Sequence, residues 1–246
     1  MDRMVYLAMT GARQMLMQQA AASNNLANAA SPGFRADLEA FRAMPVFGPG
    51  QPSRVYAMAE RPAVNFRPGS LETTGNDLDV AVDGEGFLAV QAADGTEAYT
   101  RAGDLRLNGN GMLETGNGRP VLGNGGPVAI PPAESIVIAA DGTISIRPVG
   151  QGSDTLVVVD RLKLVRPDTR ELHKGEDGLF RQKNGANPEA DASVRVVQGA
   201  LESSNVNSVS EMINMMTYQR NFELQVKAMQ TAEKNDAAMA QLMRMA

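Results

Sequence analysis

The sequence contains no cysteine and only one histidine in 246 residues. Without cysteine the chain can form no disulfide, has no thiol nucleophile and has no cysteine ligand for a metal, and the redox state of its compartment stays open. The histidine, His173, stands beside Lys174-Gly175 and Glu176-Asp177, a sequence typical of an exposed turn rather than of a catalytic base. No serine-nucleophile elbow, phosphate-binding loop or zinc motif is present, so we expect no catalytic residue, no cofactor and no metal.

Two acidic groups offer weak alternatives. Asp77, Asp79 and Asp83 lack the spacing of a calcium-binding loop, and the capping of turns accounts better for them. Glu85 could form a glycosidase pair with a neighbouring carboxylate, but nothing in the sequence supports such a pairing. The prediction is therefore that the chain is not an enzyme.

Long apolar runs and basic patches are missing as well. No stretch of eighteen apolar residues occurs, so the sequence predicts no membrane insertion. Residues 1–28 contain polar side chains throughout and lack the apolar core of a Sec signal peptide. The net charge of −5 arises within residues 78–182, while the flanking parts are neutral. Nucleic acid is therefore not an expected partner, and neutral flanks can pack side by side without strong repulsion.

The strongest pattern in the chain runs from residue 204 to residue 246. Ser208 and Glu211 have the spacing of a capping box, which predicts a helix that begins there. Apolar residues then recur at alternating steps of three and four, as in a coiled-coil seam that Gln225 and Asp236 interrupt. The seam residues are Met215, Tyr218, Phe222, Met229, Ala232, Met239 and Met243.

A second apolar set on the same predicted helix faces away from that seam. It consists of Val209, Met212, Ile213 and Met216. One partner helix cannot cover two broad apolar faces, so the pattern predicts several neighbours for this helix. We interpret it as a helix built for assembly.

A shorter helix is predicted near the N-terminus, over residues 3–28. Its apolar residues keep heptad spacing with one break at Gln19, and they are Val5, Ala8, Ala12, Met15, Ala22 and Leu26. Ser31-Pro32-Gly33 should end it, because proline disfavours helix at the preceding residue and glycine permits the turn. An ordinary surface helix that packs on its own domain explains the same periodicity.

The middle of the chain changes from irregular to strand-like patterns. Residues 34–75 are rich in proline and show no sustained period, which predicts an extended arm that neighbouring subunits order. From residue 78 onward, short alternating runs predict strands over 78–82, 87–91, 135–139, 143–147 and 155–166. Asp83–Gly86, Asp94-Gly95 and Asp141-Gly142 are predicted to be hairpin turns. Residues 184–207 are again irregular, with one predicted strand over 193–198.

Together these patterns predict an α+β fold in which N- and C-terminal helices form a coiled coil, with extended arms and an inserted all-β domain. The predicted segments are the N-terminal helix (1–30), an extended arm (31–77), the β domain (78–182), a return arm (183–206) and the C-terminal helix (207–246).

Three blocks of the sequence resemble the flagellar basal-body rod and hook proteins, the axial family of the bacterial flagellum. The first is SNNLAN at residues 23–28 followed by SPGFR at 31–35, with serine in place of the commoner threonine before the proline. The second is TGNDLDVAVDGEGF at 74–87, continued by YTRAG at 99–103. The third is GALESSNVN at 199–207, with Glu211-Met212 and QRNFE at 219–223.

The resemblance implies a structural subunit of the basal-body rod, which crosses the periplasm, transmits torque and surrounds the export channel. The terminal helices would line the inner tube, the arms would pack between subunits, and the β domain would lie outside. Implied partners are copies of the chain, other rod proteins and the flagellar type III export apparatus, through which the subunit would pass without a Sec signal. The length suits a proximal rod subunit, and a distal rod or other rod or hook position stays an alternative.

Assembly contacts are predicted at both ends of the chain. Asn24, Asn25 and Asn28 are interpreted as contacts between subunits, and hydrogen bonding at a helix end is the alternative. The remaining predicted interface residues are Leu26, Pro32, Gly33, Phe34, Asn205, Met215, Tyr218, Arg220, Phe222, Met229 and Met239.

Overall fold

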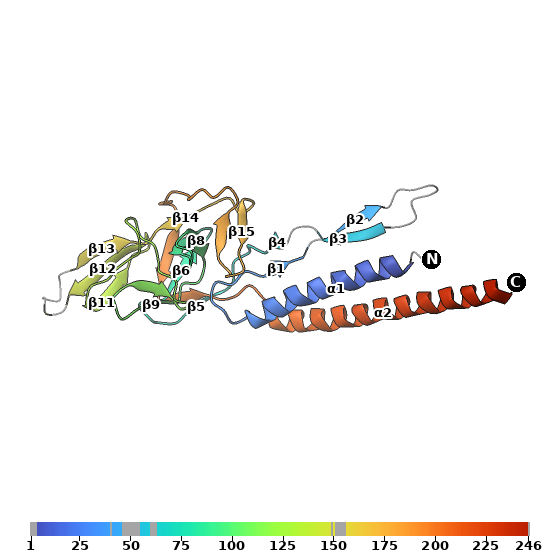
Figure 1. Ribbon diagram of the computed structural model, residues 1–246. Coiled ribbons are helices and arrows are strands. Elements are labelled where there is room, and N and C mark those ends of the chain that lie inside the picture. Colours follow the sequence, from blue (N-terminus) through green and yellow to red (C-terminus); the bar gives the residue numbers. More distant parts are fainter. Residues whose placement is uncertain are drawn as a thin grey trace. The chain divides into compact units, whose positions relative to one another are not determined.

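The computed structural model describes residues 4–39, 41–45, 55–59, 63–148, 150 and 156–245. These residues form two helices and many short antiparallel strands, which confirms the predicted α+β class (Figure 1). The chain divides into two compact units. The helical unit contains Met1–Ala29, Ala36–Asn65 and Val206–Ala246, and the β unit contains Ala30–Arg35 and Phe66–Asn205.

Helices α1 (Met4–Ala27) and α2 (Ser208–Met245) lie side by side and antiparallel within the helical unit, with the free ends of both helices at the same end of the pair (Figure 1). Small side chains are buried along the pair: Ala8, Ala12 and Ala22 on α1, and Ala232 on α2. A Cβ atom built on Gly11 would lie 3.0 Å from Cδ of Gln225, which places the predicted α2 seam against α1. Alanine and glycine let the two helix backbones approach closely.

Helix α2 begins at the predicted residue, but a different side chain caps it. The side-chain Oδ1 of Asn207 accepts a hydrogen bond of 3.0 Å from the backbone N–H of Ser210, and its backbone carbonyl accepts one of 3.0 Å from Glu211. Asn207 is therefore the N-cap, and the predicted capping box of Ser208 and Glu211 is wrong by one residue. Asparagine caps helices as well as serine does, so the pattern allowed both starts.

Two small ladders complete the helical unit. Strand β1 (Asp37–Leu38) pairs with β4 (Ala63–Val64), and β2 (Phe41–Pro45) pairs with β3 (Val55–Ala59). These strands lie in the region predicted to be an extended arm. Residues 40, 46–54 and 60–62 of that predicted arm, with Pro49, Pro52 and Pro62, lie outside the described residues.

The β unit consists of several small antiparallel sheets rather than one large sheet. Three of the sheets are pairs of strands: β5 (Leu71–Thr73) with β18 (Ala200–Glu202), β6 (Val80–Asp83) with β17 (Arg195–Gln198), and β9 (Leu105–Leu107) with β10 (Leu113–Thr115). A three-stranded sheet has the order β11 (Ala133–Ile138), β12 (Thr143–Pro148), β13 (Val157–Arg161). A five-stranded sheet has the order β14 (Leu164–Val165), β7 (Phe87–Gln91), β8 (Glu97–Thr100), β16 (Phe180–Gln182), β15 (Leu172–Lys174).

One continuous apolar core joins these sheets. Its members are mainly valine, leucine and isoleucine at alternating positions of the strands. Among those with no exposed surface are Val80, Leu88, Val90, Leu113, Val121, Val128 and Ile144. Strand β12 alternates buried and partly exposed residues, whereas β6, β7 and β8 each bury at least three consecutive residues, so these central strands are covered on both faces.

Local turn signals predicted hairpins correctly in two places and wrongly in one. Asp94-Gly95 joins the paired strands β7 and β8, and Asp141-Gly142 joins β11 and β12. Asp83–Gly86 is not a hairpin, because β6 pairs with β17 while β7 pairs with β8 and β14. The chain changes sheets there, and a turn sequence alone does not identify the partner of a strand.

Two further strand predictions have different outcomes. The strand predicted over 193–198 is confirmed as β17. The region 155–166 is divided between β13 and β14, which belong to different sheets, and Thr155 lies outside the described residues. Neither described helix combines the length and the apolar character that crossing a membrane requires.

The cap of α2 can be tested by two neighbouring substitutions. Asn207→Ala should lower the stability of the α2 start by about 1 kcal/mol, because it removes the acceptor for the N–H of Ser210. Ser208→Ala should change it by much less. Thermal melts of the helical circular-dichroism signal would measure both, and a larger loss for Ser208→Ala would contradict the assigned cap.

Candidate functional site

One buried carboxylate, that of Glu202 on β18, connects three separate segments of the β unit. Its Oε1 lies 2.6 Å from Nη2 of Arg35 and accepts a 2.8 Å hydrogen bond from the backbone N–H of Gly69. Its Oε2 accepts a 2.9 Å hydrogen bond from Nη1 of Arg101. The side chains of Arg35 and Glu202 are 1% exposed and that of Arg101 is 5% exposed, so this is a desolvated ion network.

The backbone reinforces the same junction. The N–H of Gly33 donates a 2.7 Å hydrogen bond to the backbone carbonyl of Glu202. Gly33 has φ +66°, and a Cβ built on it would lie only 2.2 Å from the carbonyl carbon of Arg101. Only glycine fits there, because any side chain would meet backbone atoms in a conformation that L residues rarely adopt.

The second arginine of the network is held by several different acceptors. Arg101 donates from Nη1 to the carbonyl of Val82 at 3.1 Å and from Nη2 to the carbonyl of Gly84 at 2.5 Å, and its guanidinium carbon lies 5.5 Å from the centre of the Phe87 ring. Burial lowers the pKa of Arg101, and the charge of Glu202 opposes that shift. The arginine is therefore fixed in place as a structural cation.

Two predicted interface residues lie at the edge of this junction. The Nζ of Lys174 lies 3.9 Å from the centre of the Phe34 ring and donates a 3.0 Å hydrogen bond to the carbonyl of Arg35. Asn205 donates from Nδ2 to the carbonyl of Arg67 at 2.8 Å and from its backbone N–H to the carbonyl of Phe34 at 3.3 Å. These contacts bring the first and third sequence blocks together.

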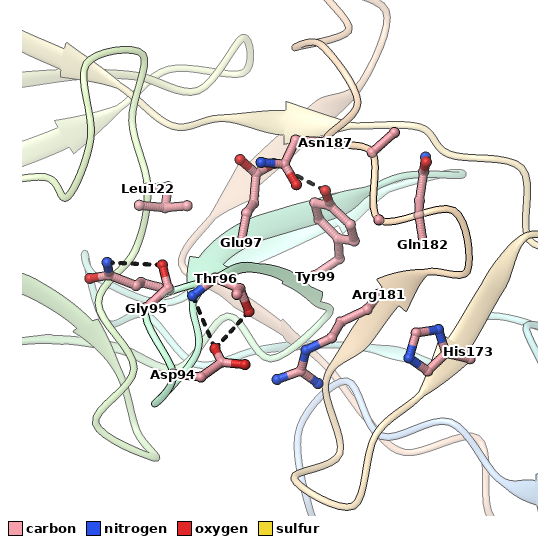
Figure 2. A pocket seen from close by; sticks show the side chains of 13 residues that line it. Asp94, Gly95, Thr96, Glu97, Tyr99, Leu122, His173, Arg181, Gln182 and Asn187 are labelled. Atoms are coloured by element: carbon pink, nitrogen blue, oxygen red, sulfur yellow. Dashed lines mark hydrogen bonds between the residues drawn. The ribbon is translucent and has the colours of Figure 1, made fainter.

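A cavity of about 540 Å³ lies elsewhere in the β unit and is lined mainly by polar side chains (Figure 2). In it the hydroxyl of Tyr99 donates a 3.1 Å hydrogen bond to Glu97, and Glu97 also pairs with Lys163 at 2.8 Å. Burial, followed by the charge of Glu97, raises the pKa of Tyr99 well above its ordinary value. With its pKa raised, Tyr99 is poorly suited to proton transfer near neutral pH.

The remaining titratable groups of that cavity do not form a catalytic arrangement. Asp94 accepts hydrogen bonds from the N–H and the hydroxyl of Thr96, which hold the pKa of that carboxyl below its usual range. Arg181 makes two hydrogen bonds to Asp177. The imidazole of His173 makes no side-chain hydrogen bond to the described residues that line the cavity, and Figure 2 shows Arg181, its neighbour across the β15–β16 ladder, between it and Asp94. Within the described part of the chain no three metal-ligating side chains cluster.

The helical unit presents a second candidate site, an apolar surface on α2. The predicted seam residues Met215, Tyr218, Phe222 and Met229 are half-buried. The opposite face is exposed, with exposed fractions of 65% for Val209, 51% for Met212, 59% for Ile213 and 60% for Met216. We call these four residues the α2 outer face.

The end of α2 is even less covered. Ala232 is fully buried, but every residue from 233 to 244 is exposed, including Met239, Leu242 and Met243. A helix of this length with two exposed apolar surfaces has apolar area that no contact within the described chain covers, and this area is available for contact with another molecule.

Comparison with known proteins identifies the family. Residues 197–242 match the family model described as the C-terminal part of the flagellar basal-body rod proteins FlgE, FlgF and FlgG, and residues 81–146 match the D1 domain of the flagellar hook protein FlgE/F/G group. The flagellar basal-body rod protein FlgF of Escherichia coli K12 is 44% identical over 251 residues, which cover 100% of both chains. FlgF of Salmonella typhimurium is also 44% identical with full coverage, and FlgF of Caulobacter vibrioides is 34% identical with 98% coverage of both chains.

The chain belongs to the FlgF family of flagellar basal-body rod proteins. This confirms the resemblance seen in the three sequence blocks, and it assigns the chain to the flagellum, to the basal body and to a structural role in motility. In the FlgF-type fold seen here, those blocks contribute the three charged members of the buried network: Arg35 from the first, Arg101 from the second and Glu202 from the third.

The structure places the predicted asparagines at the end of α1. Asn25 is buried, and its side chain makes two hydrogen bonds to the backbone of Asp37, at 2.9 Å to the carbonyl and 2.8 Å from the N–H. Asn28 donates from Nδ2 to the carbonyl of Asn24 at 3.0 Å and to its Oδ1 at 2.8 Å. The hydrogen bonds of Asn28 fit the helix-end alternative, whereas those of Asn25 join α1 to strand β1 within the helical unit; contacts of these residues between subunits stay a prediction.

The other predicted interface residues do not form one cluster. Gly33, Phe34 and Asn205 lie at the Glu202 junction in the β unit. Leu26 is half-buried at the end of α1, Pro32 is half-buried before the Gly33 turn, and Arg220 and Met239 are exposed on α2.

Sequence reasoning missed the network and one buried amide. Arg35, Arg101 and Glu202 each lie in one of the three blocks that resemble rod and hook proteins. The presence of two basic residues and one acidic residue in these separate blocks was the available sign of an ion network. Gln14 is 5% exposed on α1, although Gln19 was the residue expected to break the seam. A helical pattern read from apolar residues alone cannot reveal a buried glutamine.

Removal of the central carboxylate should be costly. Glu202→Gln should lower the free energy of unfolding of the β unit by about 3–5 kcal/mol, because two buried guanidinium groups lose their counter-charge. Glu114→Gln, which breaks an ion pair whose arginine, Arg106, is 56% exposed, should cost at most about 1 kcal/mol. Urea unfolding would compare the two, and equal losses would contradict the assigned role of Glu202.

The turn at Gly33 permits a matched test of close packing. Gly33→Ala should destabilise the β unit by clearly more than Gly75→Ala, since both glycines have positive φ but only Gly33 faces backbone atoms. Strain in the left-handed region alone should cost about 1–2 kcal/mol at Gly75. Unfolding midpoints would measure the difference, and similar losses would mean that the junction relaxes around the new methyl group.

Proposed function

We propose that the chain is a structural subunit of the proximal part of the flagellar basal-body rod. It polymerises helically with copies of itself and with other rod proteins through its terminal helices, and the assembled rod transmits torque and encloses the export channel. Segments 1–30 and 207–246 form the inner tube as a coiled coil, 31–77 and 183–206 act as arms, and the β domain inserted at 78–182 lies outside.

The observation that carries this proposal is the α2 outer face. Its four apolar side chains are each more than half exposed, although α1 covers the neighbouring seam. Burial of such a side chain contributes about 1.5–3 kcal/mol, so the face offers several kcal/mol to a neighbouring subunit. A contact that joins this face to a different surface of the next copy would propagate as an open helix, as a rod requires.

The exposed end of α2 supports folding that is completed on assembly. An isolated helical segment is marginally stable in water, and residues 233–244 bury little surface within the chain. We infer that neighbouring subunits order this segment, with apolar burial offsetting the entropy lost. The predicted interface residues Met215, Tyr218, Phe222 and Met229 would then pack both against α1 and against helices of adjacent subunits.

The position along the rod has two candidates. The 44% identity with FlgF proteins favours the proximal position. FlgG of Buchnera aphidicola is 30% identical over 97% of this chain, which keeps the distal rod as a second candidate. In either position the subunit would reach the periplasm through the flagellar type III export apparatus without a Sec signal.

A charge placed on the α2 outer face should block assembly without unfolding the monomer. Ile213→Asp should abolish swimming, since a partner would have to bury an unpaired carboxylate, while the side chain is 59% exposed in the chain itself. Gln219→Asp, at an exposed polar position of the same helix, serves as the control for helix propensity. Motility plates and purified basal bodies would give the readout, and normal rods with Ile213→Asp would refute this surface.

A further inference from the structure

A cavity of about 440 Å³ lies directly beside the Glu202 network in the β unit. Its lining includes the guanidinium groups of Arg35 and Arg101 and the aromatic rings of Phe66 and Phe87. The two phenylalanine rings pack edge to face with their centres 6.4 Å apart. The cavity therefore combines two guanidinium groups with an apolar surface.

The buried charges beside this cavity do not balance. Arg35 and Arg101 supply two positive charges, and Glu202 supplies one negative charge, all at 5% exposure or less. Both oxygens of Glu202 are already engaged, Oε1 by Arg35 and Gly69 and Oε2 by Arg101. One positive charge is left over in a desolvated place, where such a charge is expensive to maintain.

Several donors of the two arginines are also unused. Among the described residues, Nε and Nη1 of Arg35 and Nε of Arg101 have no hydrogen-bond acceptor, although these atoms are buried. A buried donor without an acceptor costs about 1–3 kcal/mol. Arg35 thus pairs with Glu202 through Nη2, while its Nε and Nη1 lack an acceptor among the described residues.

The rim of the cavity supplies only exposed carboxylates, of which the charge of Glu85 weakly opposes the lowered pKa of Arg101. Glu85 pairs with Arg166, and both side chains are more than half exposed. Asp168 is exposed, and its Oδ1 accepts a 3.0 Å hydrogen bond from the N–H of Arg170. Water screens these rim charges, whereas the buried positive charge is screened much less, so the interior of the cavity favours an anion.

We propose that this cavity is a binding site for a carboxylate group. A planar guanidinium with free N–H groups matches a carboxylate in geometry, and the Phe66 and Phe87 wall suits the methylene groups of an acidic side chain. The ligand would be a side-chain carboxylate of another protein chain or the carboxylate at the end of a chain. This site belongs to the β unit and the α2 outer face to the helical unit, and the proposal does not depend on the proposed function.

The test is a titration of the purified full-length chain with peptides, monitored by nitrogen NMR of the arginine Nε–H groups. These groups are observable in Arg35 and Arg101 because burial slows their exchange with water. Three probe peptides distinguish the sources: acetyl-Gly-Glu-Gly-amide has a side-chain carboxylate, acetyl-Gly-Gln-Gly has a terminal carboxylate, and acetyl-Gly-Gln-Gly-amide has none. We expect saturable shifts of the Arg35 and Arg101 signals with the first or the second peptide and none with the third. The tighter of the two identifies the source.

Variants and a salt control complete the experiment. Arg35→Lys, which keeps the charge but removes the planar fork, should weaken binding at least about tenfold, as judged from the Arg101 signal. Arg106→Gln, outside the cavity, should leave the affinity unchanged. The proposal is overturned if neither carboxylate peptide gives a saturable shift, or if the neutral peptide or sodium chloride gives the same one. Because the wild-type titration needs no variant, failure of Arg35→Lys to fold leaves the test intact.

Discussion

The ion network centred on Glu202 is the constraint on which the β unit depends. A carboxylate that is 1% exposed is stable only if cations and donors surround it, and here they come from Arg35, Gly69 and Arg101. These residues are far apart in the sequence, so the network forms only when the segment after α1, the end of β8 and the strand before α2 have come together.

The helical unit and the β unit differ in how much large apolar surface they bury. The β unit buries a large aliphatic core. Among its described residues the helical unit buries mostly alanine, with Gln14 and Asn25, and it leaves large methionine, valine and isoleucine side chains of α2 exposed to water. A β unit with its own core, joined to helices whose apolar surface is partly exposed, is the arrangement expected of a subunit that polymerises through its terminal helices.

The sequence allowed some of this to be predicted and not the rest. Period and turn chemistry act locally, which is why both helices, the Asp94-Gly95 hairpin and the Asp141-Gly142 hairpin were predicted correctly. Partner choice is not local, and the change of sheet at Asp83–Gly86 depends on a strand more than a hundred residues later. The same limit hid the Glu202 network, since its charges are ordinary residues until the fold brings them together. The resemblance to rod and hook proteins pointed to the three blocks that contain the charged residues of the network. It did not reveal that these residues form a buried ion network.

The most direct test of the difference between a stable β unit and a helical end that neighbouring subunits complete is hydrogen exchange. It would be measured on the purified monomer and again on assembled rods. We expect the Gly33 and Gly69 amides, which donate to Glu202, to be protected in both states, and the amides of residues 233–244 to be protected only after assembly. Strong protection of residues 233–244 in the monomer, with no change on assembly, would contradict a subunit whose helical end is completed by its neighbours.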